Sequence, residues 1–416
     1  MTNSSENNLP SQSIGDGSPV SHFPAWPHYE DDEIAAASAT LRSGRVNYWT
    51  GTEVRNFESE YASAIGARHA IALANGTAAL ELALAALGVG AGDEVITSPR
   101  SFIASASCAV MRGAKPVFAD VDRDSQNICA ATIEQALSRR TRAIIVVHLA
   151  GWPCEMDPIV DFARGRGVAV IEDCAQANGA RYRERAVGSI GDLGAFSFCQ
   201  DKIISTGGEG GLLATQDGSL WSRAWSYKDH GKDYRSVHRR DHPPGFRWVH
   251  ESFGTNWRMT EFQAAIGRRQ LTKLDRWLEQ RRRNAQRLYE GLRELAVLRI
   301  PMPGPHLRHA FYKFSVFLDP AGLNAGWSRD RVIAEINVRG VPCFSGSCPE
   351  IYLEKAFDGS SSRPVDRLPV ARELGETSLM FLVHPTLTQE HMDIACGVVR
   401  DVVGEASGSV KRRTCI

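Results

Sequence analysis

Lys202 follows an apolar segment at residues 194–198 and precedes a glycine-rich run at residues 207–211. A lysine at the end of a buried strand can project into a pocket, where desolvation or a nearby positive charge lowers its pKa and frees the amine as a nucleophile. Glycines also let the backbone approach a flat ligand closely. Because most lysines are solvated surface groups, this residue indicates a site only in combination with other groups.

Asp173 is the second candidate, because it ends the apolar run at residues 168–173. Open α/β sheets bind ligands at the carboxyl ends of their parallel strands. A buried carboxylate needs a partner, since desolvating an unpaired ion costs several kcal/mol. A protonated pyridine nitrogen is such a partner, and a turn or helix-capping role is the alternative.

The third segment is Asn75-Gly76-Thr77-Ala78, between a predicted strand and a predicted helix. A glycine at a helix N-terminus presents free N–H groups and the positive end of the helix dipole, which suit a phosphate. Helix capping alone would explain the same residues.

These segments require a sheet that brings them together. From residue 69, short β-rich runs alternate with helical runs, which predicts a mostly parallel sheet covered on both faces. The predicted strands are 69–74, 94–98, 116–121, 143–148 and 168–173, and the helices are 77–87, 103–112, 131–139 and 157–164.

After residue 176 the pattern changes to a hairpin at 180–188 and strands at 194–198 and 211–215. A long helical pattern at 260–295 leads into a smaller C-terminal part, where we expect a strand at 312–318 and helices at 329–339 and 390–403. The expected organisation is a disordered leader (1–22), a large domain (23–275), a small domain (276–405) and a flexible tail (406–416).

Composition excludes several classes of function. Lys+Arg and Asp+Glu are both 48, so the 416-residue chain has no general field for nucleic acid or anionic membranes. No apolar run reaches the roughly 20 residues of a transmembrane helix, and the polar first twenty residues are not a signal peptide. Nine scattered cysteines show no zinc-binding spacing and predict reduced thiols in a cytoplasmic protein without a metal site.

In combination, the motifs resemble the sugar aminotransferases of the DegT/DnrJ/EryC1/StrS family, a branch of the fold-type I enzymes that use pyridoxal 5′-phosphate (PLP). The resemblance covers residues 26 to 403. It implies an α/β fold with a mostly parallel, seven-stranded sheet between helices and a smaller α+β C-terminal domain. The matching segments are 50–51 with 57–58, 75–80, 116–122, 148–151, 172–176, 196–198 with Lys202, 208–211 and 256–261.

The resemblance also implies roles around the cofactor ring. Lys202 would form the internal aldimine and shuttle the proton between the substrate Cα and the cofactor C4′. Asp173 would pair with the pyridinium nitrogen and keep the ring an electron sink. Gln176 would bond the 3-oxygen, and Phe102 would stack on one ring face with Ala175 on the other.

For the phosphate, the resemblance implies contacts from Gly76, Thr77 and Ser197, joined by Asn256 from the neighbouring subunit. Family members are dimers with active sites at the interface, so we expect a homodimer.

Three features depart from the family pattern. Asp201 replaces the usual small hydroxyl residue before the lysine, which predicts either local phosphate contacts or a solvent-facing side chain. Glu209 follows Lys202 by seven positions (209 − 202 = 7), one more than in many members. The 344–352 segment lacks the histidine of a His-Tyr-Pro segment found in many members, and we expect this loop to meet the substrate.

The expected reaction is transfer of an amino group from glutamate to a keto carbon of a nucleotide-linked deoxysugar, by way of pyridoxamine phosphate. Three hairpin arginines are candidates for the nucleotide diphosphate: Arg181, Arg183 and Arg185. The alternatives are a keto-cyclitol aminotransferase or aminodehydratase of the same family, and a non-catalytic PLP-binding regulatory protein. Lys202 argues against the sugar dehydratases, which carry histidine in its place.

Overall fold

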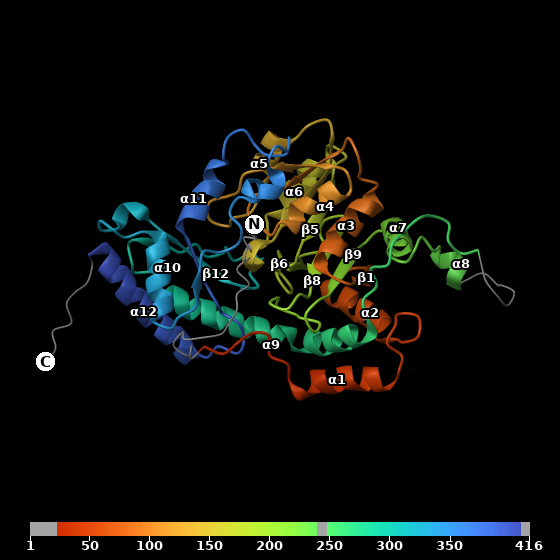
Figure 1. The fold of residues 1–416 in the computed structure, drawn as a ribbon, viewed down its shortest axis with the longest axis horizontal. Helices are drawn as coiled ribbons and strands as arrows, with labels where there is room; N and C mark the ends of the chain where they lie inside the picture. The colour runs from red at the N-terminus through yellow and green to blue at the C-terminus, as the bar shows by residue number, and fades with distance from the viewer. Residues whose placement is uncertain (1–22, 239–247, 409–416) are drawn as a thin grey trace, which may run out of the picture.

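The computed structural model of the chain describes residues 23–238 and 248–408. The predicted leader, residues 1–22, lies outside the described residues. Figure 1 shows a large α/β unit built around a central sheet and a smaller unit beside it, with the long helix α9 running along both.

The central sheet has seven strands in the order β1-β9-β8-β5-β4-β2-β3. The four pairs from β8 to β3 are parallel, and only β9 is antiparallel to its neighbours β1 and β8. This confirms the predicted mostly parallel sheet. The strands are β1 (His69–Leu73), β2 (Glu94–Thr97), β3 (Lys115–Phe118), β4 (Thr141–Val147), β5 (Ala169–Asp173), β8 (Leu193–Ser197) and β9 (Gly211–Thr215).

Helices cover both faces of this sheet, which explains why its strands are apolar at nearly every position. In β4, Ala143, Ile145 and Val147 pack with α3, α4 and α7, whereas Ile144 and Val146 pack on the opposite face with α5 and α6. Helix α2 and part of α9 complete that second face. The covering helices are α2 (Glu53–Ile65), α3 (Gly76–Leu87), α4 (Ala104–Met111), α5 (Ala130–Ala136), α6 (Met156–Arg164) and α7 (Gly218–Lys228).

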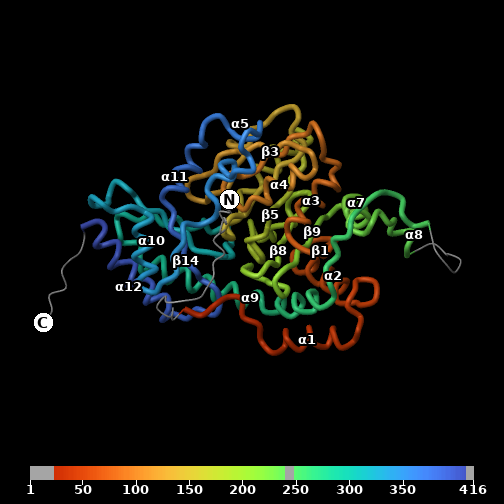
Figure 2. Tube along the Cα trace, in the orientation of Figure 1, coloured from red at the N-terminus to blue at the C-terminus, as the bar shows by residue number. Residues whose placement is uncertain are grey.

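Helix α9 (Glu261–Leu292) is the long helix that the sequence predicts. Thr260 begins it with a capping box that includes Gln263. It packs on α1 (Asp31–Arg42) and α2 in the large unit and on α12 (Gln389–Ser407) in the small one. The Cα trace in Figure 2 shows its course between the two units. The predicted domain boundary at residues 275–276 therefore falls inside a continuous helix.

The small unit is a four-stranded antiparallel sheet, ordered β10-β12-β14-β13, packed against helices. Its elements are β10 (Leu298–Arg299), β12 (Phe314–Leu318), α10 (Arg329–Val338), β13 (Cys343–Phe344), α11 (Pro369–Thr377), β14 (Ser378–Phe381) and α12. Because Val403 and Ala406 are buried, α12 continues to Ser407, and the first two residues of the predicted tail are helical. Residues 409–416 of that tail lie outside the described residues.

A third, three-stranded sheet joins the two units. The predicted hairpin is formed by β6 (Arg181–Tyr182) and β7 (Arg185–Ala186), and β11 (Leu307–Arg308) pairs with β6. The sequence pattern did not indicate β11, nor the short helix α8 (Tyr234–His238). None of the described helices combines the length and apolar character that crossing a membrane requires.

Candidate active site

A cavity of about 640 Å³ opens at the carboxyl ends of β5 and β8. It collects all the predicted site residues except Asn256, whose neighbour Trp257 lines it. Asn256 is predicted to act in the neighbouring subunit's site, which a single chain does not contain. The predicted residues that line the cavity are Gly76, Thr77, Phe102, Asp173, Gln176, Ser197 and Lys202.

One end of the cavity is a cradle at the N-terminus of α3. Asn75 caps the helix, with its Oδ1 accepting the N–H of Ala78 at 2.8 Å. The backbone is packed closely here, because a Cβ on Gly76 would lie 2.6 Å from the Cβ of Ser197, and one on Gly211 would lie 2.2 Å from the Asn75 carbonyl oxygen. Since the first N–H groups of a helix lack intrahelical acceptors, the cradle suits a phosphate.

Asp173 lies at the end of β5 and is only 4% exposed. Its Oδ2 accepts a hydrogen bond from the Ser105 hydroxyl at 2.7 Å, and its Oδ1 accepts from the Ala175 N–H at 3.1 Å. Burial raises the pKa of Asp173, against the opposing effects of these bonds and of the positive charge of Lys202. Both donors of this buried carboxylate are neutral, so a cationic group in the cavity would add a charged partner and the site fits a protonated ring nitrogen. Ser105 was not found from the sequence, because a buried serine in an alanine-rich helix carries no signal.

Gln176 has a fixed orientation in the cavity wall. Its Oε1 accepts the N–H of Ala150 at 2.8 Å, so its amide NH₂ remains to donate a hydrogen bond. Phe102 is 66% exposed in the single chain, as an aromatic residue with an open ring face would be. Ala175 also lines the cavity.

Glu172, beside Asp173, points into the protein and has a structural role. Burial alone would raise its pKa, but the hydrogen bonds it accepts outweigh burial and lower the pKa below its ordinary value. Each carboxylate oxygen is used twice. The donors are His148 Nε2 (3.0 Å) and the N–H groups of Gly188 (2.8 Å), Ile190 (2.7 Å) and Gly191 (2.7 Å).

The ligand atoms of His148, Glu172 and Cys174 lie within 4.8 Å of one another, a spacing at which a metal ion could bind. However, His148 Nδ1 accepts the N–H of Cys154 at 2.9 Å, so Nε2 is the donor to Glu172. With both groups engaged in hydrogen bonds, this cluster connects strand ends and offers no free ligand pair.

Lys202 enters the cavity with its side chain 16% exposed. Its Nζ lies 3.3 Å from Asp201 Oδ1 and 3.4 Å from the Tyr312 hydroxyl, which itself donates to Asp201 Oδ2. The Trp26 indole N–H donates to the Lys202 carbonyl at 2.8 Å. Asp201 thus has partners within the protein, and its side chain is also 53% exposed, which agrees with the expected solvent-facing side chain; its contact with a phosphate stays a prediction. The sequence could not indicate Tyr312 or Trp26, because 110 and 176 positions separate them from Lys202.

The hairpin arginines have partners within the chain. Arg183 and Arg185 both pair with Asp157, and Arg181 donates to the Glu184 carbonyl at 2.8 Å. They lie on the surface with intramolecular partners.

The 344–352 loop docks on the chain that leads to Phe102. Cys348 pairs with Ser101 through an isolated β-bridge, and the Ile351 N–H donates to the Pro99 carbonyl at 2.8 Å. The loop therefore lies next to one wall of the cavity.

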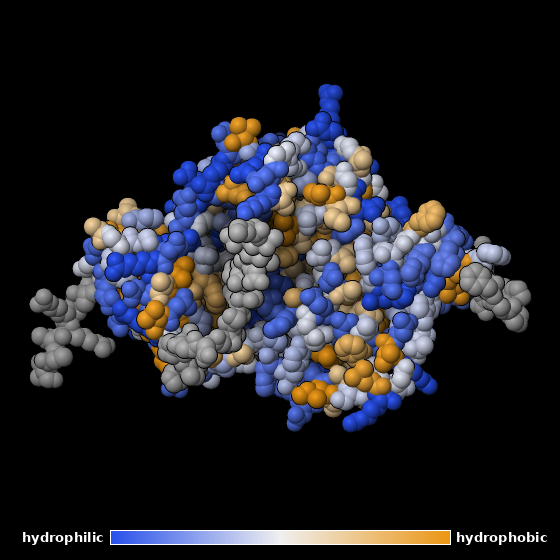
Figure 3. Space-filling view, in the orientation of Figure 1, coloured by the Kyte–Doolittle hydropathy of each residue, from blue (hydrophilic) through white to orange (hydrophobic). Residues whose placement is uncertain are grey.

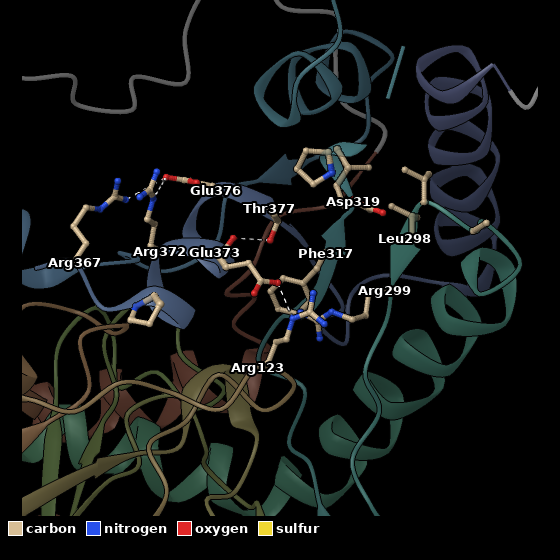
Figure 4. Close-up of a pocket in the computed structure, with 15 residues that line it drawn as sticks. Arg123, Leu298, Arg299, Phe317, Asp319, Arg367, Arg372, Glu373, Glu376 and Thr377 are labelled. Atoms are coloured by element: carbon tan, nitrogen blue, oxygen red, sulfur yellow. Dashed lines mark hydrogen bonds and ion pairs between the residues drawn. The ribbon is translucent and has the colours of Figure 1, made fainter. Parts of the chain in front are cut away.

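A second cavity of about 710 Å³ lies between β10, β12 and α11 (Figure 4). It contains none of the predicted site residues, and each of its four arginines pairs with an acidic side chain, so it offers no comparable chemistry. The pairs are Arg123–Glu373 (2.7 Å), Arg299–Asp124 (2.5 Å), Arg367–Glu376 (3.3 Å) and Arg372–Glu376 (3.0 Å).

Comparison with known proteins identifies the family of the chain. The model of the DegT/DnrJ/EryC1/StrS aminotransferase family matches residues 27–400. The chain is 35% identical to the spore coat polysaccharide biosynthesis protein SpsC of Bacillus subtilis, over 89% of this chain and 94% of that protein. It is 38% identical to the GDP-perosamine synthase of Caulobacter vibrioides, over 82% of this chain and 88% of the synthase.

Among solved structures, an aminotransferase from Psychrobacter cryohalolentis superposes with a TM-score of 0.91 at 52% identity, covering 92% of this chain and 99% of that one. The fold and the cavity define a fold-type I transferase. The chain belongs to the DegT/DnrJ/EryC1/StrS aminotransferase family, and it is a PLP-dependent transaminase.

Proposed function

We propose that Lys202 binds the PLP carbonyl carbon and that the cavity around it is the catalytic site. When bound, PLP supplies an electron-withdrawing ring that stabilises negative charge on the substrate carbon. The Asp173 carboxylate holds the ring nitrogen in its protonated form, and the Gln176 amide donates to the 3-oxygen. Once released, the Lys202 amine takes and returns the proton of the substrate carbon.

The phosphate is proposed to lie in the cradle at the start of α3. Gly76 and Thr77 offer backbone N–H groups, and Ser197 offers its hydroxyl. Asn256 of the partner subunit completes this set, and Phe102 covers one face of the ring. The observation that carries the proposal is that one cavity brings together Asp173, Gln176 and Lys202 with this cradle.

The proposed substrate is a keto derivative of a nucleotide-linked deoxysugar, with glutamate as the amino donor. Similarity to the GDP-perosamine synthase over 88% of its length supports a sugar substrate. The 344–352 loop is the proposed sugar-facing wall, since it packs against the segment that carries Phe102.

The proposed active form is a homodimer. Several large apolar side chains are exposed in the single chain, among them Phe253 (99%), three positions before Asn256, and Met111 (69%) at the end of α4. On α1, Ile34 and Leu41 are more than half exposed, and Figure 3 shows apolar groups along that helix. A second subunit would cover such groups. Sedimentation velocity of the purified chain measures the oligomeric state, and a monomer would contradict this proposal.

We propose a cytoplasmic location. The eight cysteines among the described residues are all free thiols, as expected in a reducing compartment.

The test of the function is amination by the purified, PLP-loaded chain. Keto-sugars linked to GDP, dTDP or UDP are offered with glutamate or glutamine, and a keto-cyclitol serves as the competing substrate class. We expect turnover of a nucleotide-linked keto-sugar with glutamate. Lys202→Ala should abolish both turnover and the absorbance band of the lysine-bound cofactor, while the control Lys355→Ala, at an exposed lysine, keeps both. Turnover by Lys202→Ala would refute the proposed role of the lysine, and turnover of the cyclitol alone would refute the sugar substrate.

A further inference from the structure

We propose that Asp201 and Tyr312 are positioning residues for Lys202, with the Asp201 carboxylate as the counter-charge of the lysine amine and the Tyr312 hydroxyl fixing that carboxylate. The inference rests on the proposed role of Lys202. Its basis is a closed set of contacts. Lys202 Nζ approaches Asp201 Oδ1 at 3.3 Å and the Tyr312 hydroxyl at 3.4 Å, and this hydroxyl donates to the other oxygen of Asp201.

The charges around this set explain why a carboxylate is needed there. Besides Lys202, the half-buried Lys313 and the buried Arg281 act on the same region, and both are desolvated. Burial, with the charges of Arg281 and Lys202, lowers the pKa of Lys313 to about 8, while Asp201 opposes this shift. His384 is also buried beside these cations, and burial with their charges lowers its pKa to about 3, so it contributes no positive charge near neutral pH.

Asp201 is the carboxylate that acts on both Lys202 and Lys313, whereas Asp173 interacts with the charge of Lys202 alone among these cations. Burial raises the pKa of Asp201, but the charge of Lys202 and the hydrogen bond from Tyr312 together lower it by more, so the net shift is downward. Asp201 is therefore ionised across the neutral range and places a negative charge beside the Lys202 nitrogen.

Tyr312 can fix Asp201 because its own backbone is held by the segment that also orients Gln176. Its N–H donates to the Ala150 carbonyl at 2.9 Å, and the N–H of Ala150 donates to Gln176. Gly151 makes this approach possible, since its φ is +94° and a Cβ there would lie 3.1 Å from the Tyr312 nitrogen. Ala150 thus links Gln176, through its N–H, to the Tyr312 that contacts Lys202 and Asp201, through its carbonyl.

In the PLP-loaded protein, the role predicts a specific effect on the proton affinity of the nitrogen that joins Lys202 to the cofactor. A carboxylate within about 4–6 Å of a cation typically moves the cation's pKa by one to three units. Because the Asp201 side chain is 53% exposed, solvent weakens the effect, and we expect the lower end of this range.

The experiment is a pH titration of the absorbance of the PLP-loaded protein, followed without any substrate. We expect Asp201→Asn to lower the pH midpoint of the absorbance change by about one unit. Asp201→Glu, which keeps the charge, should restore most of the shift, and the control Glu184→Gln on the exposed hairpin should leave the midpoint unchanged. An unchanged midpoint in Asp201→Asn would overturn the role of Asp201 as counter-charge.

A double-mutant cycle tests whether Tyr312 acts through Asp201. Tyr312→Phe should move the midpoint in the wild-type background and have no effect in Asp201→Asn. Additive effects of the two substitutions would overturn the link between them. Because no sugar or donor is present, failure here is distinct from failure of the proposed function. A wild-type protein with the expected band but without keto-sugar turnover would refute the function alone.

Discussion

Glu172→Gln tests whether a buried carboxylate, and not merely a polar group of its size, joins the strand ends below the active site. In the wild type, Oε1 accepts the N–H groups of Ile190 and Gly191, and Oε2 accepts the N–H groups of Gly188 and the His148 ring. Glutamine turns one oxygen into an NH₂ group. Whichever oxygen is replaced, two buried donors lose their acceptor and face another donor.

The magnitude follows from that count. Leaving a buried donor unsatisfied costs about 1–3 kcal/mol, so two such donors cost roughly 2–6 kcal/mol of unfolding free energy. The assay is urea unfolding of the cofactor-free chain, followed by circular dichroism at neutral pH, so that ligand binding does not contribute. Glu184→Gln is the control and should change stability by less than about 0.5 kcal/mol, as exposed positions do. A loss of less than about 1 kcal/mol in Glu172→Gln would refute the assignment of four accepted hydrogen bonds.

Three further predictions concern the same strand ends and the cradle. The stabilisation by Glu172 should be present at pH values above its unfolded-state pKa of about 4.3 and should be lost as pH falls through the depressed folded-state pKa. The difference in unfolding free energy between wild type and Glu172→Gln should therefore shrink in acid. A pH-independent difference would contradict this prediction. Asp173→Asn should keep the cofactor band but lower kcat on the order of 10²–10³-fold, because the ring nitrogen loses its counter-charge, and wild-type kcat would argue against that pairing. Gly76→Ala should weaken PLP binding at least about tenfold in a fluorescence titration, because its Cβ would lie 2.6 Å from the Cβ of Ser197; unchanged affinity would show that the cradle can relax.

Much of the fold could be predicted from the chain because its signals are local. The alternation of apolar runs with helical runs indicated the parallel sheet, and the capped helix of residues 260–295 was located to within a few residues of α9. Short elements such as β11 and β13 were not predicted, because two residues show no hydrophobic periodicity and such strands form only where a partner strand is present. Helix α12 passed its predicted end at residue 403 because burial of Val403 and Ala406 stabilises a further turn.

For the proposed site, the sequence indicated the chemical groups: the amine of Lys202, the carboxylate of Asp173 and the glycine-rich cradle that begins at Gly76. Each follows a strand or begins a helix, so local pattern sufficed to indicate it. Only the tertiary structure decided the partners of these groups. Ser105 meets Asp173, and Tyr312 meets Asp201, across contacts of 68 and 111 positions in the chain. Such contacts depend on how helices and strands pack, and a hydroxyl far away in sequence leaves no trace in the local pattern around the residue that it positions.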